Sequence, residues 1–387
     1  MHPFTYQNPT RILFGRGGIG RVGNEAAHLG SRILLVHGSR FLKERGWLEK
    51  ILTPLRAAGL EVVEYGGVRP NPLLNHVREG IRIVRKEGIA AIVAAGGGSV
   101  MDSAKAIAAG ALVEHDVWQF FKGKKGIRAA LPLICIPTLA GSGSEMNCGM
   151  VLTNEKTSQK FGIGNKALFP RVSLLDPEIT CSVPPNHSAY GAVDAIVHLL
   201  EHYFTTTDQE TPVQRRLAEG LIITVMESCE IILQNPHDYD ARANIMWAAA
   251  LALNGVASAG LGWVGFPMHM IEHSLSALYD IPHGAGLAAI LPAWLRFQAE
   301  TDPHKLAAFG KRIFNIQAEN PETDARHTIT AMKHWLEGLS CPTSLSELGI
   351  AETDIPAIAE NALGLAKLWR LREYTQKVIE KILRSCE

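Results

Sequence analysis

Residues 88–110, GIAAIVAAGGGSVMDSAKAIAAG, join an apolar run to three consecutive glycines and then to a stretch of good helix formers. Such an apolar run is typical of a strand that is buried on both faces, as in a parallel sheet. Glycines after the strand let a ligand approach the backbone, and the N–H groups that open the following helix attract phosphate. The segment therefore predicts a strand, loop and helix of an α/β domain that binds a nucleotide.

The same alternation extends over the first half of the chain. Further β-rich runs, separated by amphipathic stretches, lie at 10–14, 31–38, 61–67, 131–138 and 171–177. Beyond Pro184 and Pro185 only long helical patterns follow, and the two prolines indicate a boundary. We therefore expect an α/β domain with a parallel, Rossmann-like sheet at 1–184 and an all-helical domain at 185–387.

The composition excludes several classes of function. The 387 residues include 38 basic and 38 acidic side chains that are mixed along the chain, which disfavours binding to nucleic acid or to an anionic membrane. No apolar run approaches the roughly 18 residues that span a bilayer, and the N-terminus lacks the layout of a signal peptide. The six cysteines form no CxxC pair, so neither disulfides nor a thiolate zinc site are expected. We expect a cytoplasmic protein whose partner is a small molecule.

Three glycine-rich loops are candidates for binding a nucleotide. Gly15 to Gly20 matches GxGxxG, but no acidic residue ends the next strand, and a simple turn is the favoured interpretation. The loop from Gly96 to Ser99 is the better candidate, because it follows an apolar strand directly and opens a helix. Residues 136–145, IPTLAGSGSE, follow another strand and are rich in glycine and hydroxyl side chains, which are typical of a ligand-binding loop.

A second group of residues has the character of a metal site. Asp194 and His198 lie four residues apart in a helical pattern, so they share one helix face and can chelate a divalent cation, although such a pair can also form a simple hydrogen bond. Downstream, His269, His273 and His283 form a dense histidine cluster in apolar surroundings. Spacing alone favours His269 and His273 as the second chelating pair, because they also lie four residues apart.

Several of these motifs resemble one known family. GGGSVMDSAK at 96–105 resembles the GGGSxxDxAK signature of the iron-containing alcohol dehydrogenases, and 136–145 resembles their PTTAGTGSE-type loop with Leu139 and Ser142 in place of threonines. The segments 4–15, 69–72 and 174–180 also fit, so the likeness covers most of both domains. Within the family, the sequence is most similar to the butanol dehydrogenase and broad-range aldehyde reductase branch.

The resemblance implies a role for each candidate residue. Four residues would bind one divalent cation, Fe²⁺ or Zn²⁺: Asp194, His198, His269 and His283. His273 would lie beside the substrate and the nicotinamide and would relay a proton, whereas His202 matches no ligand position and is expected at the surface or around the ligands. Residues expected to contact the coenzyme are Gly97, Gly98 and Ser99 at the pyrophosphate, and Asp102, Thr138, Ser142, Asn147 and Lys160 at the nicotinamide and ribose.

The residues at the end of the predicted strand at 31–38 bear on the choice of coenzyme. NAD-preferring family members tend to carry an acid there, whereas this sequence has Gly38, Ser39 and Arg40. Without a carboxylate to repel a 2′-phosphate, and with a serine and an arginine nearby, NADP is favoured over NAD.

The expected function is hydride transfer between NAD(P)H and a small aldehyde or primary alcohol. A dehydroquinate synthase-like cyclase is the alternative enzyme, but such enzymes need basic residues at the metal, and the histidine-rich segments contain almost none. A binding protein that merely kept the fold would be expected to have lost a metal ligand. Because family members associate and the N-terminal segment favours β-structure, we expect a homodimer or a larger homo-oligomer.

Overall fold

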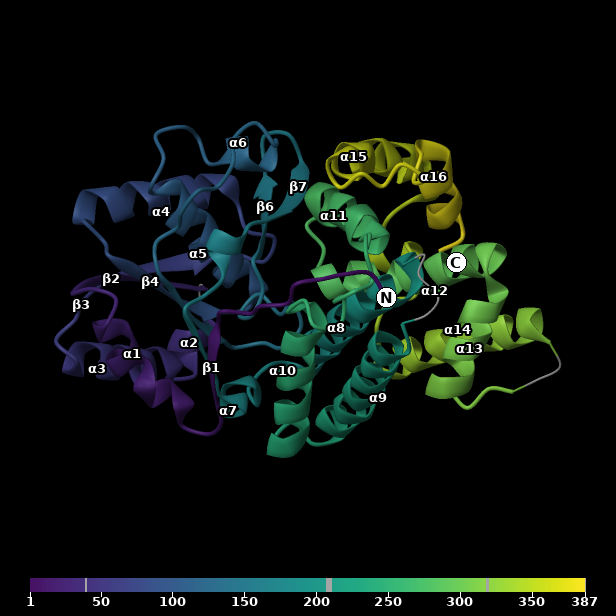
Figure 1. Ribbon diagram of the computed structural model, residues 1–387, viewed down its shortest axis with the longest axis horizontal. Coiled ribbons are helices and arrows are strands. Elements are labelled where there is room, and N and C mark those ends of the chain that lie inside the picture. The colour runs from purple at the N-terminus through teal and green to yellow at the C-terminus, as the bar shows by residue number, and fades with distance from the viewer. Residues whose placement is uncertain (39, 207–210, 318–319, 387) are drawn as a thin grey trace. The chain divides into compact units, whose positions relative to one another are not determined.

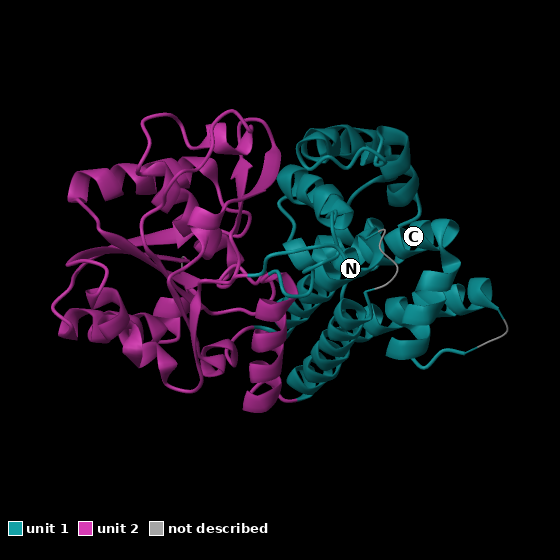
Figure 2. Cartoon of the chain, viewed as in Figure 1, with its two compact units in different colours: residues 1–6, 184–234, 255–387 teal, residues 7–183, 235–254 magenta. Residues whose placement is uncertain are grey.

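The structure is a computed structural model that describes residues 1–38, 40–206, 211–317 and 320–386. The chain forms two compact units, which are coloured separately in Figure 2. The α/β unit contains Gln7–Val183 and Asn235–Asn254, and the helical unit contains Met1–Tyr6, Pro184–Gln234 and Gly255–Glu387. The chain thus leaves the α/β unit between Val183 and Pro184, and one later segment returns to it.

A six-stranded, fully parallel sheet forms the centre of the α/β unit. Its strands, in spatial order, are β1 (Arg11–Phe14), β8 (Val172–Leu175), β5 (Leu133–Pro137), β4 (Ala91–Gly96), β2 (Arg32–Gly38) and β3 (Glu61–Val68). Each predicted strand is present, and the predicted fold class is confirmed.

The strand order places the candidate nucleotide loops at one point of the sheet. From β2 the chain first continues to β3 on one side and then crosses to β4 on the other side, so the order reverses between β2 and β4. Ligands of open parallel sheets bind beyond the carboxyl ends of the strands at such a switch point. The ends of β2 and β4, at Gly38 and Gly96, therefore lie where this rule expects a nucleotide.

Helices cover both faces of the sheet, which explains why β4 is buried along its whole length. Helices α1 (Val22–Ala27) and α3 (Trp47–Ala57) lie on one face, and α4 (Leu74–Glu87) and α5 (Gly98–Gly110) lie on the other (Figure 1). Alternate residues of β2, such as Ile33 and Leu35, pack against α3 in the first layer. The remaining helices of this unit are α2 (Phe41–Glu44), α6 (Trp118–Phe121), α7 (Pro177–Thr180) and α10 (Tyr239–Leu253).

A two-stranded antiparallel hairpin follows the third glycine-rich loop and was not predicted from the sequence. Strand β6 (Gly149–Asn154) pairs with β7 (Gln159–Gly164), and β6 contacts α4 and α5. Met150 and Leu152 are buried, whereas the turn is exposed and includes Ser158 with a positive φ. The hairpin brings Lys160 onto the side of the sheet that carries α5.

The helical unit consists of long helices, as the sequence beyond Pro184 and Pro185 predicted. They are α8 (Pro185–Thr205), α9 (Pro212–Gln234), α11 (Pro267–Tyr279), α12 (His283–Thr301), α13 (Pro303–Ile313), α14 (Pro321–Gly338), α15 (Ile355–Leu368) and α16 (Gln376–Arg384). Prolines open α8, α11, α13 and α14. A backbone N–H at the start of a helix has no acceptor within the helix, so a proline there costs no hydrogen bond. Helices α8, α11 and α12 contact one another and carry all the candidate metal ligands.

Candidate functional site

Three helices bring the four candidate metal ligands together. Asp194 and His198 lie one turn apart on α8, His269 lies in the first turn of α11, and His283 is the first residue of α12. A short connection links α11 to α12, in which Asp280 has a positive φ and Pro282 precedes the helix. The turn after α11, and not helical spacing, therefore positions His283.

One carboxylate oxygen is the centre of the cluster. Oδ1 of Asp194 lies 3.6 Å from Nδ1 of His198, 3.3 Å from Nε2 of His269 and 3.6 Å from Nε2 of His283. Two ligands bound at about 2.1 Å to a tetrahedral cation lie roughly 3.4 Å apart. The three separations from Asp194 are close to this value. The donor atoms of Asp194, His198 and His269 also lie within 4.8 Å of one another, a group that does not include His283.

The polar atoms of the cluster also fit a cation. Nδ1 of His198 is buried and has no hydrogen-bond partner among the described residues. Asp194, His198 and His269 are at most 6% exposed, while the side chain of His283 is 28% exposed. Three imidazoles and one carboxylate suit iron(II) or zinc(II), and the more exposed side at His283 leaves room for a further oxygen ligand.

The pKa values show how strongly these groups interact. Burial alone would raise the pKa of Asp194, but His198, His269 and His283 outweigh it and hold that pKa well below its usual range. Burial lowers the pKa of His198 to about 3. Burial would lower the pKa of His269, but Glu201 and Asp194 outweigh this effect and raise the pKa of His269 to about 10. The cluster therefore favours positive charge next to Asp194.

Two carboxylates that the sequence analysis did not single out lie behind the histidines. Glu201 on α8 and Glu272 on α11 are fully buried. An oxygen of Glu201 lies 2.5 Å from Nδ1 of His269, and Glu272 contacts Nδ1 of His283. Each glutamate follows a candidate ligand histidine by three residues. This spacing is visible in the sequence but does not indicate which residue the glutamate contacts.

The other histidines of this region lie close to the candidate ligands. The ring of His273 is 3% exposed, with its centroid 5.7 Å from that of His283 and 5.6 Å from that of Trp369. His202 is also buried, at 3% exposure, so it does not lie at the surface. Its ring packs edge-on against Phe266, and burial lowers its pKa to about 4.

In the α/β unit, the second and third glycine-rich loops meet. Helix α5 begins at Gly98, with Gly97 as its N-cap and Ser99 in its first turn. A Cβ at Gly98 would lie 2.6 Å from Oγ of Ser142, so only glycine allows the two loops to approach so closely. Thr138 donates its backbone N–H to the carbonyl of Gly96 at 3.1 Å. Together these residues surround the N-terminus of α5, which is a favourable position for a phosphate.

The loop after β5 is held by a buried network. Asp102 accepts hydrogen bonds from Oγ of Ser144 at 2.6 Å and from the N–H of Val151 at 2.9 Å. Oδ1 of Asn147 accepts from Nζ of Lys105 at 3.0 Å and from the N–H of Gly149 at 2.8 Å. Burial raises the pKa of Asp102 and lowers that of Lys105, and each charge opposes the shift of the other. Asp102 and Asn147 therefore shape the loop through contacts within the protein.

Lys160 lies on β7 and is only 5% exposed, unlike a lysine on a solvated surface. Its Nζ donates a hydrogen bond to Oδ1 of Asn71 at 3.0 Å, and its charge opposes the rise in the pKa of Asp102 that burial causes. Asn71 adopts a positive φ within the RPNP segment and is also buried. The RPNP segment fits the family pattern, but no role for Asn71 was predicted from the sequence.

Two of the residues that bear on the choice of coenzyme, Gly38 and Arg40, lie at and just after the end of β2. Gly38 is the last residue of the strand, and Arg40 is exposed and precedes α2. Ser39 lies outside the described residues. The GxGxxG match at Gly15 to Gly20 follows the edge strand β1 and forms a turn with a short 3-10 helix, away from the switch point between β2 and β4.

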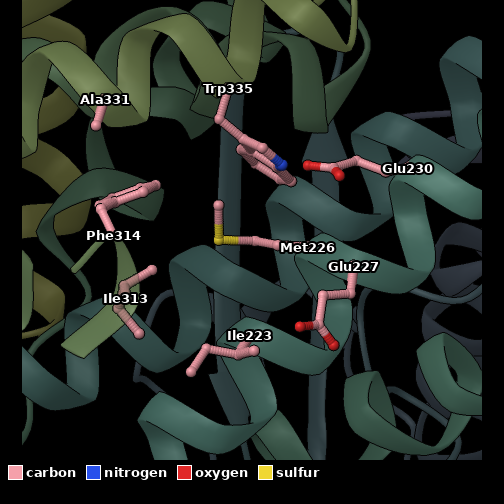
Figure 3. Close-up of a pocket in the computed structure, with 8 residues that line it drawn as sticks. All are labelled: Ile223, Met226, Glu227, Glu230, Ile313, Phe314, Ala331 and Trp335. Atoms are coloured by element: carbon pink, nitrogen blue, oxygen red, sulfur yellow. The ribbon is translucent and has the colours of Figure 1, made fainter.

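The helical unit also has a surface groove of about 370 Å³ (Figure 3). Met226, Phe314 and Trp335 contribute apolar walls, and the exposed Glu227 and Glu230 complete the lining. Its lining includes none of the candidate metal, coenzyme or proton-transfer residues. The groove is thus separate from the candidate site.

Two family models match the chain. The model described as "Iron-containing alcohol dehydrogenase" matches residues 9–177, and the model described as "Fe-containing alcohol dehydrogenase family, C-terminal" matches residues 188–386. The first match covers the candidate coenzyme loops, and the second covers all four candidate metal ligands.

Individual relatives are similar over their full lengths. The chain is 36% identical over 389 residues to the "Probable NADH-dependent butanol dehydrogenase 1" of Bacillus subtilis, covering 100% of both chains. It is 35% identical to the "NADPH-dependent aldehyde reductase YqhD" of Escherichia coli, covering 99% of both. The crystal structure of "NADH-dependent butanol dehydrogenase A" from Thermotoga maritima superposes with a TM-score of 0.96, at 41% identity, covering 100% of this chain and 99% of the other.

Among the residues that the structure describes, no helix combines the length and the apolar character needed to cross a membrane.

Proposed function

The chain belongs to the iron-containing alcohol dehydrogenase family, and from this premise we propose that it interconverts small aldehydes and primary alcohols with NADPH and one divalent cation. Membership of the family makes it a metal-dependent alcohol or aldehyde oxidoreductase. The observation that carries the proposal is the convergence of three imidazoles on one oxygen of Asp194.

Asp194, His198, His269 and His283 are the proposed ligands of the cation, either iron(II) or zinc(II). When bound, such an ion polarises the carbonyl of an aldehyde and stabilises the negative charge that develops as hydride arrives from the nicotinamide. The protein contributes the fixed geometry of α8, α11 and α12, so the donors need no rearrangement during the reaction. Asp194 supplies the anionic ligand, and the exposed side of His283 provides access for the substrate oxygen.

His273 is the proposed proton carrier. Its ring lies beside those of His269 and His283, with centroids 6.3 and 5.7 Å away. An imidazole can deliver a proton to the product oxygen during reduction and remove it during oxidation. The neighbouring ring of Trp369 limits the space around His273 and keeps the imidazole beside the ligands.

For the coenzyme, we propose that Gly97, Gly98 and Ser99 bind the pyrophosphate through backbone N–H groups at the start of α5. Thr138, Ser142, Asn147, Asp102 and Lys160 are the residues proposed to line or shape the site of the nicotinamide and its ribose. The buried ammonium of Lys160 supports this role, because a buried charge needs polar partners and a coenzyme hydroxyl would add one.

We propose NADPH as the preferred coenzyme, because β2 ends at Gly38 without a carboxylate and is followed by the exposed Arg40. An acid at this strand end would repel a 2′-phosphate, and a guanidinium attracts one. The named relatives include both types of enzyme, one NADH-dependent in Bacillus subtilis and one NADPH-dependent in Escherichia coli.

The proposed substrates are short aliphatic aldehydes such as butanal, in line with the names of these relatives. The ring centroid of Phe266 lies 5.9 Å from that of His269. This apolar ring beside a proposed ligand favours an apolar substrate.

We further propose that two copies of the chain associate through β1. We also propose that the protein works in the cytoplasm. Strand β1 forms one edge of the sheet, and Phe14 and Trp247 are exposed beside it, in an edge-on pair. A free strand edge flanked by aromatic side chains favours pairing with a second chain. None of the six cysteines, all of which lie in the described residues, forms a disulfide, which is typical of a reducing compartment. Sedimentation at several concentrations tests the dimer, and a Phe14→Asp variant that sediments like the unmodified protein contradicts pairing through β1.

The coenzyme and substrate proposals are tested by following the oxidation of NADPH and NADH with butanal. We expect turnover with both, and a higher kcat/KM with NADPH. Turnover with NADH alone would overturn the interpretation of Gly38 and Arg40 but not the metal site. Absence of turnover with any short aldehyde or alcohol would overturn the proposed substrate class.

A further inference from the structure

A chain of carboxylates links the three helices that carry the candidate metal ligands. Two of these helices, α8 and α11, carry a glutamate three residues after their candidate histidine ligand, and each glutamate contacts the histidine of the next of the three helices. Glu201 follows His198 on α8 but contacts His269 on α11. Glu272 follows His269 on α11 but contacts His283 on α12.

We propose that Glu201 and Glu272 are positioning residues that orient His269 and His283 for metal binding, an inference that rests on the proposed metal centre. In both pairs the carboxylate meets Nδ1, while Nε2 faces Oδ1 of Asp194. A carboxylate that accepts the Nδ1 proton fixes the tautomer in which Nε2 has a free lone pair, and it makes the ring a stronger ligand. The orientation of both rings is thereby set before any ion binds.

Burial makes these contacts strong and costly to lose. Both glutamates are 0% exposed, so their charges have little access to water and depend on the groups around them. A hydrogen bond to an ionised acceptor in such surroundings is stronger than a neutral one. Each glutamate therefore restrains one imidazole more firmly than ring packing alone would.

The two glutamates differ in what else they hold. Oε1 of Glu201 also accepts the backbone N–H groups of Met268 at 2.6 Å and His269 at 3.2 Å, so this side chain caps the start of α11. Glu272 contacts the hydroxyl of Ser276 instead. Replacing Glu201 should therefore lower both metal affinity and stability, whereas replacing Glu272 should act mainly on the metal.

A glycine on α12 preserves the space that Glu272 needs. A Cβ at Gly286, one turn after His283, would lie 2.9 Å from Cγ of Glu272 and 3.1 Å from its Oε1. An alanine there would displace the carboxylate without touching any proposed ligand. By contrast, a Cβ at Gly220 on α9 meets no atom within 4 Å, which makes Gly220→Ala a matched control.

The experiment measures the zinc affinity of the full chain. Bound metal is first removed, and zinc is then titrated in competition with a coloured chelator. The visible spectrum of the cobalt(II) form is recorded as a second measurement. Glu201→Gln and Glu272→Gln each keep the shape of the side chain but remove its charge. Glu219→Gln is the control, because Glu219 is buried in the same unit and bonded to Tyr203, away from the ligands.

We expect one zinc ion per unmodified chain, a zinc affinity about 10- to 100-fold lower in both variants, altered cobalt bands, and no change in Glu219→Gln. Gly286→Ala should also weaken zinc binding, and it serves as the test if a glutamate variant fails to fold. Affinities and cobalt spectra equal to those of the unmodified protein would overturn the inference. Two zinc ions per chain would overturn it for Glu272, because Glu272, His273 and His283 would then be ligands of a second ion. If the unmodified protein binds no metal, the proposed function itself fails.

Discussion

The ammonium of Lys105 lies 3.0 Å from the side-chain oxygen of Asn147, in a pocket where the lysine is 1% exposed. The same Nζ donates to the carbonyls of Asn147 and Gly149 and to Oγ of Ser144. One lysine of the GGGSVMDSAK segment thereby fixes the loop after β5 to helix α5.

Lys105→Met should loosen this loop, because it leaves two carbonyls and a hydroxyl buried without their donor. We expect the free energy of unfolding to fall by roughly 2–5 kcal/mol and the dissociation constant of NADPH to rise at least about tenfold. Denaturant unfolding and coenzyme titration measure the two effects. Lys86→Met is the control, because Lys86 is exposed. Unchanged NADPH affinity in Lys105→Met would show that the loop does not depend on this anchor.

Glu145 predicts a specific dependence of stability on pH. Burial raises its pKa from 4.5 to about 7, against the opposing effects of its own backbone N–H and Lys105. The folded state therefore binds more protons than the unfolded state between these values, and the stability of the native protein falls as pH rises through this window. Glu145→Gln lacks this titration, so its stability relative to the native protein should increase by roughly 3 kcal/mol from pH 4.5 to 7.5.

Chemical denaturation of both proteins at several pH values measures this difference, with Glu155→Gln, at an exposed position, as the control. A stability difference between Glu145→Gln and the native protein that stays constant over the window contradicts the account of Glu145.

Gly38→Asp should reverse the coenzyme preference. A Cβ at Gly38 would lie 3.8 Å from the carbonyl oxygen of Val68, an ordinary contact, so a side chain can start at this position without a clash of its Cβ. The new carboxylate would repel a 2′-phosphate and accept hydrogen bonds from a ribose diol. We expect the ratio of kcat/KM for NADPH to that for NADH to fall at least about tenfold, equivalent to about 1.4 kcal/mol. Gly38→Ala separates charge from size, and an equal effect in that variant would rule out the electrostatic explanation.

His273→Ala distinguishes a proton carrier from a metal ligand. If His273 transfers a proton, kcat should fall by roughly 10²-fold or more while the zinc content stays at one ion per chain. Metal analysis and steady-state kinetics of the same preparation give both values. Loss of zinc together with activity would instead favour the pairing of His269 with His273 that the spacing alone suggested.

Much of this organisation could be predicted from the sequence, because it depends on local patterns. The apolar strands, the loop at Gly96 to Ser99 and the helical second half follow from periodicity and from glycine and proline positions, and the fold confirms them. The β6–β7 hairpin was missed because its pairing depends on contacts with α4 and α5.

The proposed metal site was only partly predictable from local patterns. Asp194 and His198 follow from helical spacing, but His283 reaches Asp194 through the turn between α11 and α12, which no spacing rule describes. The sequence resemblance supplied that ligand. Glu201 and Glu272 each contact a histidine on a different helix, so only the three-dimensional structure reveals their partners.

The central claim is that Asp194 and three histidines hold a catalytic metal ion. It is tested most directly by measuring NADPH oxidation with butanal in metal-stripped protein, in protein reloaded separately with iron(II) or zinc(II), and in an Asp194→Asn variant treated identically. We predict that activity is lost on stripping, returns with at least one of the two ions, and stays absent in the variant, which should also bind less metal. Full activity in the stripped protein, or in Asp194→Asn, would contradict the claim.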